Sequence, residues 1–392
     1  MTKPPRTVRR LSYLAVAQVP GERAHSMQIA ETCAALARHL DELELIVPRL
    51  GAQRGSSDVL PGVRLVRLLA PNFLPLGRWA PAWLMRILFD VQSSAFARLA
   101  LARALVRALV RRRFDVYYTR SPFVAVAFAF MFGFRAVLEL HVPPAGPMRR
   151  ALLRLCRLFG CRFVAISDAL RRRVAALLCV EPDEIGVAHD GYDPALFSKL
   201  PDRAETRRRL GLADETFAIC YLGSAATLGA AKGVRFIAEA FRRAALPDAT
   251  LLLAGIEQGE DALAGPDIRC LGRIPHEKIA ALLAACDCAV VSFPENADYA
   301  RAMSPLKLFE YLAAGLPIIA PDFPNLREVL DESCALLVPL TDAAALAAAM
   351  TRLRTDAALR SRLAAGAAER ASAYTWDARA ERLLAFLRLP AA

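Results

Sequence analysis

The chain has 392 residues, of which 55% are hydrophobic and 23% are charged, a composition typical of a folded protein with two or three domains. Its formal net charge of +12 is confined to the first half, because residues 1–200 carry a net +14 and residues 201–392 a net −2. This excess predicts an anionic partner for the first half, such as a membrane surface or a phosphorylated acceptor. Nucleic acid is not expected, since no zinc-finger, RNP-type or regular basic and aromatic pattern occurs.

Cysteine usage and hydropathy indicate where the protein works. The nine cysteines form no C-x-x-C pair and lie mostly in apolar runs, so we expect reduced, buried thiols in a cytoplasmic protein. The basic segment 1–10 leads into a strand-like run rather than a signal peptide, and no run of about 18 uninterrupted apolar residues occurs. We therefore expect no membrane span, and peripheral binding at the inner face of the cytoplasmic membrane as the one membrane association.

The first half alternates short apolar runs with amphipathic stretches, which is the pattern of an α/β domain. Strands are predicted at 11–16, 43–47, 63–68, 115–119, 136–140, 162–166 and 185–187. Helices are predicted at 24–40, 122–132, 149–159 and 169–178. The polar segment 201–209 that follows is expected to be a linker.

Residues 72–114 combine tryptophans with many arginines and leucines. Such a stretch is typical of a basic amphipathic segment that lies in a bilayer interface. It is equally typical of two core-facing helices with a solvated arginine face. The sequence leaves both interpretations open.

One histidine stands at a position of functional interest. His141 directly follows the predicted strand 136–140 and precedes two prolines, so it leaves the carboxyl end of a strand. Open α/β sheets bind their ligands at that edge. A structural role and a functional role are both compatible with this placement.

The second half repeats the same alternation of short apolar runs and amphipathic stretches. Strands are predicted at 218–222, 250–254, 268–271, 288–293 and 318–320, and helices at 234–243, 276–285, 343–371 and 377–388. Two successive βα arrays predict two Rossmann-like domains. Neither array begins with the G-x-G-x-x-G fingerprint, which argues against a nicotinamide dehydrogenase.

A short helix is predicted between Ser304 and Gly315, with Ser304 as its N-cap and Pro305 as its first residue. The N-terminus of such a helix is suited to bind a phosphate. Lys307 and Glu310 lie three residues apart and therefore share one helix face, where they suit a nucleotide's phosphate and ribose. The alternative is an ordinary surface Lys–Glu pair.

Short motifs along nearly the whole chain, taken in their order and spacing, carry a family resemblance. They are Tyr118–Thr119–Arg120, Glu139–Leu140–His141, Ala165–Ile166–Ser167, Ala188–His189–Asp190–Gly191, Gly223 with Lys232–Gly233, Leu253–Ala254–Gly255, Leu271–Gly272–Arg273 and Ser304–Pro305–Leu306–Lys307–Leu308–Phe309–Glu310–Tyr311. The chain resembles the retaining glycosyltransferases of family 4, the glycosyl transferases group 1. This resemblance implies the GT-B fold, in which two Rossmann-like domains face each other across a cleft.

The resemblance also implies a division of labour along the chain. Residues 1–203 would bind the acceptor, residues 204–375 would bind a nucleotide-sugar, and residues 376–392 would form a helix that packs back on the N-terminal domain. The donor would be a UDP- or GDP-sugar, with no other cofactor. The acceptor would be a hydroxyl group of a glycan or of a lipid-linked molecule, and the sugar would be transferred with retention of configuration.

The candidate site residues follow from the same motifs. The resemblance places Glu310 on the ribose hydroxyls, Lys232 on the diphosphate and His141 at the catalytic centre, and we take these three as the catalytic residues. The donor-binding residues that it implies are Gly223, Lys232, Arg273, Ile274, Ser304, Pro305, Leu306, Lys307 and Glu310. Of these, Arg273 and Ile274 would line the base pocket.

The expected chemistry requires no metal. Departure of a nucleoside diphosphate builds negative charge on the β-phosphate, which fixed cations and helix amides stabilise as it develops. The chain contains no D-x-D motif, so we expect metal-independent transfer. We expect front-face attack, with the leaving phosphate drawing the acceptor's proton and His141 contacting the donor sugar.

Two positions depart from the family pattern. Ala302 stands where the family has its first glutamate, and Ser224 stands where an arginine usually follows Gly223. Sugar contacts would then come from the backbone near Ser304 or from Glu295, and Arg273 or Lys307 would replace the missing cation. These departures keep two alternatives open: a catalytically silent nucleotide-binding subunit, and a nucleotide-sugar epimerase or hydrolase.

Overall fold

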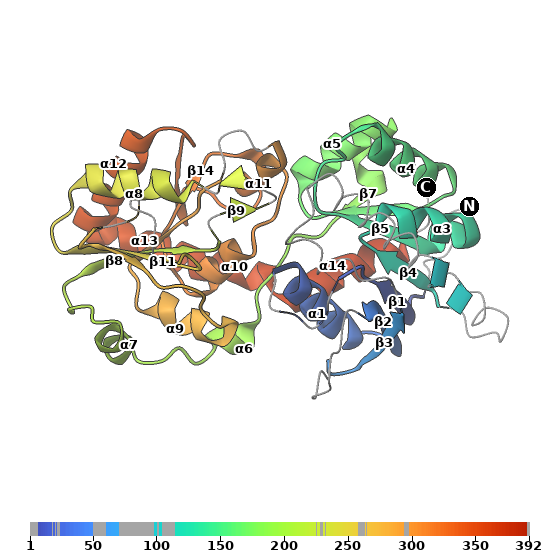
Figure 1. Ribbon diagram of the computed structural model, residues 1–392, viewed down its shortest axis with the longest axis horizontal. Coiled ribbons are helices and arrows are strands. Elements are labelled where there is room, and N and C mark those ends of the chain that lie inside the picture. Colours follow the sequence, from blue (N-terminus) through green and yellow to red (C-terminus); the bar gives the residue numbers. More distant parts are fainter. Residues whose placement is uncertain are drawn as a thin grey trace. The chain divides into compact units, whose positions relative to one another are not determined.

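The computed structural model describes residues 7–17, 19, 21, 24–49, 60–69, 98–99, 102–103, 114–224, 226–227, 230–231, 233–257, 263, 265–293 and 298–389. The chain divides into two compact units. Unit 1 comprises Met1–His189 and Trp376–Ala392, and unit 2 comprises Asp190–Thr375. Each unit is built on one parallel sheet with helices packed on it (Figure 1).

Unit 1 contains a seven-stranded sheet in the order β3-β2-β1-β4-β5-β6-β7. All its neighbours run parallel, and the order reverses between β1 and β4, as in doubly wound folds. The strands are β1 (Arg10–Leu14), β2 (Glu42–Arg49), β3 (Val63–Leu69), β4 (Val116–Thr119), β5 (Ala136–Leu140), β6 (Arg162–Ala165) and β7 (Ile185–Val187).

The helices of unit 1 connect these strands and include the last helix of the chain. Those whose bounds lie within the described residues are α1 (Ala24–Ala37), α3 (Pro122–Phe132), α4 (Pro147–Leu158), α5 (Asp168–Leu178) and α14 (Trp376–Arg388), with short 3₁₀ turns at Gly133–Arg135 and Pro182–Glu184. The predicted strands and helices of this half are present within a few residues of their expected bounds. The stretch 72–114 lies outside the described residues, apart from 98–99, 102–103 and 114.

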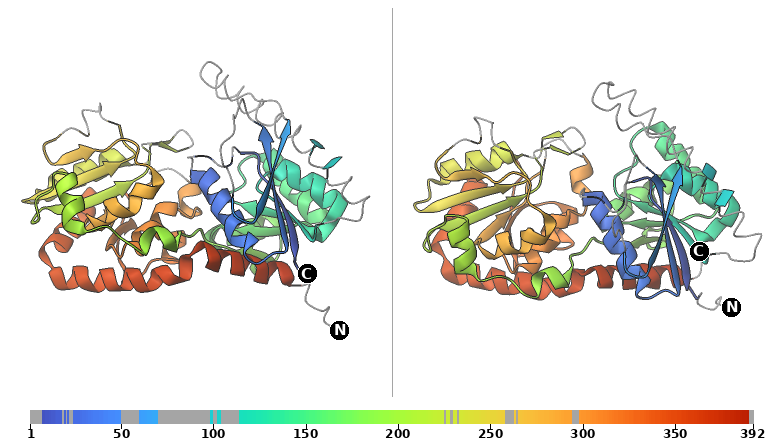
Figure 2. Two further views of the ribbon diagram at one scale, coloured as in Figure 1. Left: turned by 90° about the horizontal axis from the view of Figure 1, so that it is seen from below. Right: turned by 60° about the horizontal axis from the view of Figure 1, so that its bottom comes forward.

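Helix α14 belongs to unit 1 although the chain reaches it only after passing through unit 2. It packs against α1, and Figure 2 shows the two helices side by side. Arg162 at the start of β6 donates hydrogen bonds to the carbonyl oxygens of Phe386 and Leu387 at 2.6 and 2.9 Å. Gly186 of β7 lies under the Phe386 ring, which a Cβ at that position would meet at 2.7 Å.

Unit 2 contains a six-stranded parallel sheet in the order β12-β11-β8-β13-β14-β15, with its reversal between β8 and β13. The strands are β8 (Phe217–Leu222), β11 (Ala249–Ala254), β12 (Ile268–Cys270), β13 (Cys288–Val290), β14 (Ile318–Pro321) and β15 (Ala335–Val338). A separate two-stranded ribbon pairs β9 (Ala226–Thr227) with β10 (Ala230–Ala231).

The helices of unit 2 cover both faces of this sheet (Figure 1). They are α6 (Pro194–Phe197), α7 (Arg203–Arg209), α8 (Val234–Ala244), α9 (Ile279–Ala284), α10 (Leu306–Ala313), α11 (Pro324–Arg327), α12 (Ala343–Thr355) and α13 (Ala357–Ala371), with 3₁₀ turns at His276–Lys278, Asp298–Arg301 and Ser372–Tyr374.

Period-two alternation along β8 divides the core of unit 2 into two layers. Ala218, Cys220 and Leu222 face the cluster that contains α9 and α10. Phe217, Ile219 and Tyr221 face the cluster that contains α8 and α12. Because both faces are covered, the strand is apolar at every position, as expected for a buried parallel strand.

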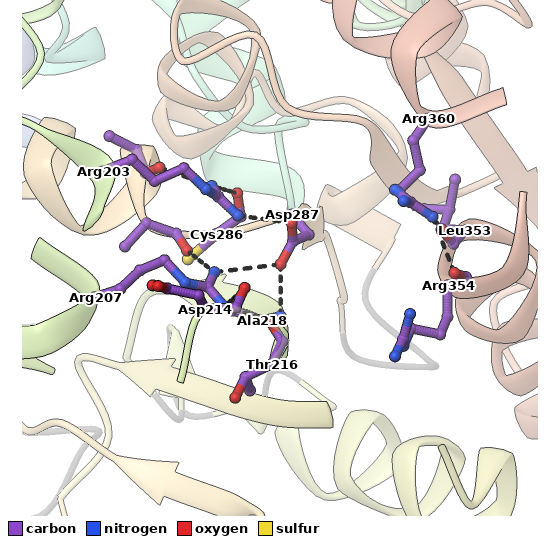
Figure 3. A network of polar contacts seen from close by, with 12 residues as sticks. Arg203, Arg207, Asp214, Thr216, Ala218, Cys286, Asp287, Leu353, Arg354 and Arg360 are labelled. Carbon is purple, nitrogen blue, oxygen red and sulfur yellow. Dashed lines mark hydrogen bonds and ion pairs between the residues drawn. The ribbon is translucent and has the colours of Figure 1, made fainter. Parts of the chain in front are cut away.

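The predicted linker at 201–209 is wrong, since residues 203–209 form helix α7. Arg207 is 2% exposed and donates to the carbonyl oxygens of Ala213 and Ala285, both at 2.8 Å. Arg203 and Arg207 also pair with Asp287 at 2.7 and 3.5 Å, as the network in Figure 3 shows. Carbonyl and carboxylate acceptors thus fix a segment whose polarity alone predicts a solvated linker.

The units separate at 189/190, whereas the boundary expected from the family resemblance is at 203/204. The residues between these positions are attached to unit 2. Asp190 N–H donates to Ser304 Oγ at 3.1 Å, and the Tyr192 N–H donates to the Tyr374 carbonyl oxygen at 3.1 Å. These contacts join residues more than 100 positions apart, which a local sequence pattern does not reveal.

Candidate functional site

The carboxyl edge of the unit 2 sheet carries glycines where three adjacent strands end. The Gly223 N–H donates to the Ala254 carbonyl oxygen at 2.9 Å, and the Gly255 N–H donates to the Gly272 carbonyl oxygen at 2.7 Å. Gly255 has φ +88°, and a Cβ there would lie 2.7 Å from the Gly223 oxygen. Backbone therefore packs directly on backbone at this edge, which suits close approach of a phosphate to main-chain groups.

Helix α10 begins at the same edge, but its N-cap is Pro305 and not the predicted Ser304. Pro305 is extended, at φ −80° and ψ 121°, and the helix starts at Leu306. The Ser304 hydroxyl accepts the Asp190 N–H instead of capping the helix. Deeper in the helix, the Leu222 N–H at the end of β8 donates to Tyr311 Oη at 2.8 Å, which fixes α10 against the strand.

The amine of Lys307 is directed toward the end of β8. A Cβ on Gly223 would lie 3.3 Å from Lys307 Nζ, so the amine and this glycine are neighbours. Nζ also lies 4.0 Å from the centre of the Tyr221 ring, within the range of a cation–π interaction. The structure therefore brings together two of the predicted donor-binding residues, and places a positive charge at the sheet edge.

Glu310 lies one turn further along α10 and contacts a residue that the sequence analysis did not select. His276 Nε2 is 2.9 Å from Glu310 Oε1, and the side chains are 34% and 14% exposed. His276 follows Arg273 by three residues and Ile274 by two, so it lies next to the segment predicted to line the base pocket. This proximity to the predicted base pocket is the sequence signal that could have marked His276 as a candidate site residue.

The remaining predicted donor residues have different outcomes. Lys232 and Glu295 lie outside the described residues. Arg273 is exposed at the turn after β12, and Ile274 packs against the α10 side of the core. Ser224 is exposed beside the edge glycines.

Ala302 is fully buried in unit 2. The loop around it is held by Asn325, whose Nδ2 donates to the carbonyl oxygens of Ala300 and Met303 at 2.9 and 2.7 Å. A carboxylate at position 302 in this conformation would lose its hydration. Alanine therefore fits the packing of this chain.

In unit 1, His141 lies just beyond β5, at the carboxyl edge of the sheet as predicted. Its Nε2 is 2.8 Å from Oε1 of Glu139, the penultimate residue of β5, whose side chain is fully buried. Burial tends to raise the pKa of Glu139, but Arg120, Arg379 and His141 outweigh it and hold that pKa well below its ordinary range. An ionised carboxylate therefore lies behind the histidine.

The described part of the chain holds neither a cluster of metal-ligating side chains nor a membrane-spanning helix. There, no three His, Cys, Asp or Glu side chains gather closely enough to ligate a metal ion. No described helix combines the length and the apolar character needed to span a bilayer. The nine cysteines are all free, and seven of them are buried.

Most of unit 2 matches a family of known proteins. Residues 216–356 match the family model of the glycosyl transferases group 1. This group 1 glycosyltransferase match begins just before β8 and ends after α12, so it includes the edge glycines, Lys307, Glu310 and His276.

Among curated proteins, the chain is 31% identical over 246 residues to the D-inositol 3-phosphate glycosyltransferase of Stackebrandtia nassauensis. The alignment covers 56% of this chain and 54% of that protein, so the chain spans about half the length of the curated relatives it matches. The relatives are named as glycosyltransferases, in agreement with the group 1 match.

Solved structures resemble both units. The sucrose-phosphate synthase from Thermosynechococcus elongatus has a TM-score of 0.71 at 20% identity, covering 96% of this chain and 97% of that one. The Anabaena protein HepE, solved in complex with UDP and glucose, has a TM-score of 0.66 at 17% identity, covering 96% and 98%. These likenesses and the two parallel-sheet units confirm the predicted GT-B fold class.

Proposed function

We propose that the protein is a retaining, metal-independent glycosyltransferase that moves a sugar from a nucleotide-diphospho-sugar to a hydroxyl acceptor. The main support for this proposal is the geometry of the sheet edge in unit 2. The group 1 match includes a sheet edge where the Lys307 amine lies beside the Gly223 backbone, and the helix that carries this lysine also carries Glu310 one turn further along. Those are the groups that a diphosphate and a ribose require.

Each group has a defined role in this proposal. Lys307 and the first amides of α10 hold the diphosphate beside Gly223 and stabilise the charge that develops as it leaves. Glu310 accepts hydrogen bonds from the ribose hydroxyls, and Arg273 with Ile274 contacts the base. Lys232 supplies a further positive charge to the diphosphate. The departing phosphate takes the proton of the attacking hydroxyl, and His141 contacts the donor sugar.

The donor nucleotide is proposed to be UDP or GDP, and the acceptor a polyol, glycan or lipid-linked hydroxyl. The names of the curated relatives make inositol phosphates the natural first acceptors to test. HepE was solved with UDP and glucose, which makes UDP-glucose a suitable first donor. Because Ala302 is buried, sugar recognition depends on other groups, for which we propose the backbone near Ser304 or Glu295.

Product analysis tests this function against its alternatives. The protein is incubated with UDP- and GDP-sugars, with and without a hydroxyl acceptor, and nucleotide release and product mass are measured. Transfer predicts release that depends on the acceptor and a product heavier by one sugar. Release without an acceptor would indicate a hydrolase, and binding without release would indicate a silent subunit. The second alternative is motivated by Ala302 and Ser224.

We also propose that unit 1 binds the anionic inner face of the cytoplasmic membrane. Helix α4 buries only Leu153 and Cys156, and it presents apolar and basic side chains together. Phe130 of the adjoining helix α3 is 72% exposed, and Leu158 at the end of α4 is 75% exposed. The α4 surface consists of Phe130, Met148, Arg149, Arg154, Leu155 and Leu158, all exposed. Mixed basic and apolar groups suit an anionic bilayer interface.

Replacing Arg149 and Arg154 by glutamine should weaken binding to anionic vesicles on the order of 30-fold, since each arginine contributes about 1 kcal/mol near such a surface. Co-sedimentation with phosphatidylserine-containing liposomes at low salt measures the change. The matched control is Arg208→Gln with Arg243→Gln, which removes two exposed charges from unit 2. Equal losses in both variants would contradict a role for the α4 surface.

A further inference from the structure

A cluster of buried charges lies behind His141, and its members come from distant parts of the chain. Glu139 Oε1 accepts from His141 Nε2 at 2.8 Å and from Arg120 Nη2 at 3.4 Å. It also accepts from Arg379 Nη2, and Tyr13 Oη lies 3.3 Å from Oε2. One carboxylate thus joins β1, the end of β4, β5 and the C-terminal helix α14.

Arg379 holds its place through acceptors on three other segments. Its Nη1 donates to the carbonyl oxygens of Ala188 and His189, the latter at 2.9 Å, and its Nε lies 3.3 Å from Thr32 Oγ1. The arginine is fully buried. Its guanidinium therefore connects α14 to α1, to the segment after β7 and to Glu139.

The side chains of this cluster differ in solvent exposure, and His141 is the most exposed of them. The side chain of Glu139 is 0% exposed, that of Arg379 1%, that of Arg120 14% and that of His141 24%. The charges of Glu139 and Arg379 are therefore buried beneath the partly exposed His141 ring, at the carboxyl edge of a parallel sheet. A buried ion cluster is costly to desolvate and adds little net stability over apolar packing, so its placement here points to a role in the site.

We infer that Glu139 is the positioning residue for His141, and that Arg379 makes the C-terminal helix part of the same arrangement. This inference rests on the proposed function for its catalytic consequence. An ionised carboxylate can only accept hydrogen bonds, so the ring nitrogen that faces Glu139 carries a proton. The contact fixes both the ring orientation and which nitrogen is protonated. Arg379 and Arg120 keep the carboxylate charged and in place.

The histidine ring reports on this arrangement directly by long-range ¹H–¹⁵N NMR. The chain has five histidines, so a His141→Gln spectrum assigns the ring. In the unmodified protein we expect the Nε2 signal of a protonated nitrogen. Glu139→Gln should shift it, because an amide can also donate and so permits the other tautomer. Glu139→Asp should restore part of the original shift.

Sugar transfer provides the second measurement. We expect Glu139→Gln to lower kcat roughly 10- to 100-fold, as for the loss of ring orientation, with the donor KM changed less than about threefold. Arg379→Lys should give a smaller loss in kcat. The matched control is Glu44→Gln, which alters another fully buried carboxylate of the same sheet, paired with Arg103 at the opposite side of β1.

The two measurements separate this inference from the proposed function. An unchanged His141 spectrum in Glu139→Gln, or an equal change in Glu44→Gln, would overturn the positioning role even if the protein transfers sugar. Absence of transfer in the unmodified protein, with the expected spectral change, would reject the proposed function and retain the contact between Glu139 and His141. Transfer with an unaltered kcat in Glu139→Gln would also overturn the positioning role.

Discussion

Glu310→Ala should weaken the binding of the donor nucleotide roughly 10- to 100-fold, because hydrogen bonds to a charged acceptor contribute about 1.5–3 kcal/mol. The carboxylate is 14% exposed and lies one turn beyond Lys307, where a ribose would follow the diphosphate. Isothermal titration calorimetry with UDP, or with GDP if it is preferred, measures the change. The unmodified protein should bind the 2′-deoxy nucleotide more weakly than the ribonucleotide.

The comparison of ribose with deoxyribose makes this prediction specific. If Glu310 accepts the ribose hydroxyls, Glu310→Ala should reduce the preference for the ribonucleotide toward unity. Glu277→Ala is the matched control, because Glu277 is an exposed glutamate on the turn that carries His276. A variant that binds weakly yet keeps the full ribose preference would place the carboxylate outside the ribose site. The His276 contact would then be purely structural.

Arg379→Met should destabilise unit 1 by about 3 kcal/mol, because it leaves a buried carboxylate with fewer cations. For a unit of this size that loss corresponds to a fall in Tm of about 6–12 °C. Tryptophan fluorescence reports on the correct unit, since Trp79, Trp83 and Trp376 all belong to unit 1. Arg157→Met is the control, and its half-exposed pair with Glu184 should cost less than about 1 kcal/mol.

The dependence on pH follows from the lowered pKa of Glu139. A carboxyl whose pKa falls on folding stabilises the folded state above its unfolded pKa, about 4.3, and this contribution is lost as the pH falls through the folded pKa. The deficit of Arg379→Met should therefore shrink in acid, where the protonated carboxyl needs no cation. Glu139→Leu combined with Arg379→Met should recover much of the loss at neutral pH. A deficit that is independent of pH and persists in the double variant would contradict the ion-pair explanation.

The fold could largely be read from the sequence, because the elements of both units depend on local patterns. The strand Ala136–Leu140, the helix Pro122–Phe132 and the strand Ile185–Val187 have the predicted bounds, since turn residues or prolines delimit each of them. The predictions fail where a side chain forms its hydrogen bonds with residues far away in the sequence. The hydrogen bond from Arg207 to the Ala285 carbonyl oxygen holds α7 in place where the sequence predicts a linker. Ser304 accepts a hydrogen bond from the Asp190 N–H instead of capping α10.

The candidate site divides in the same way. The sequence by itself predicted that Gly223 and Lys307 belong to one site and that His141 follows the end of a strand, and the structure places both so, because a parallel sheet collects its carboxyl ends at one edge. Only the tertiary structure decided which partners these residues have. His276 reaches Glu310 across 34 positions and Arg379 reaches Glu139 across 240, and no periodic pattern encodes such pairs. Side chains that meet only after the sheet and helices have packed are decided by geometry in three dimensions.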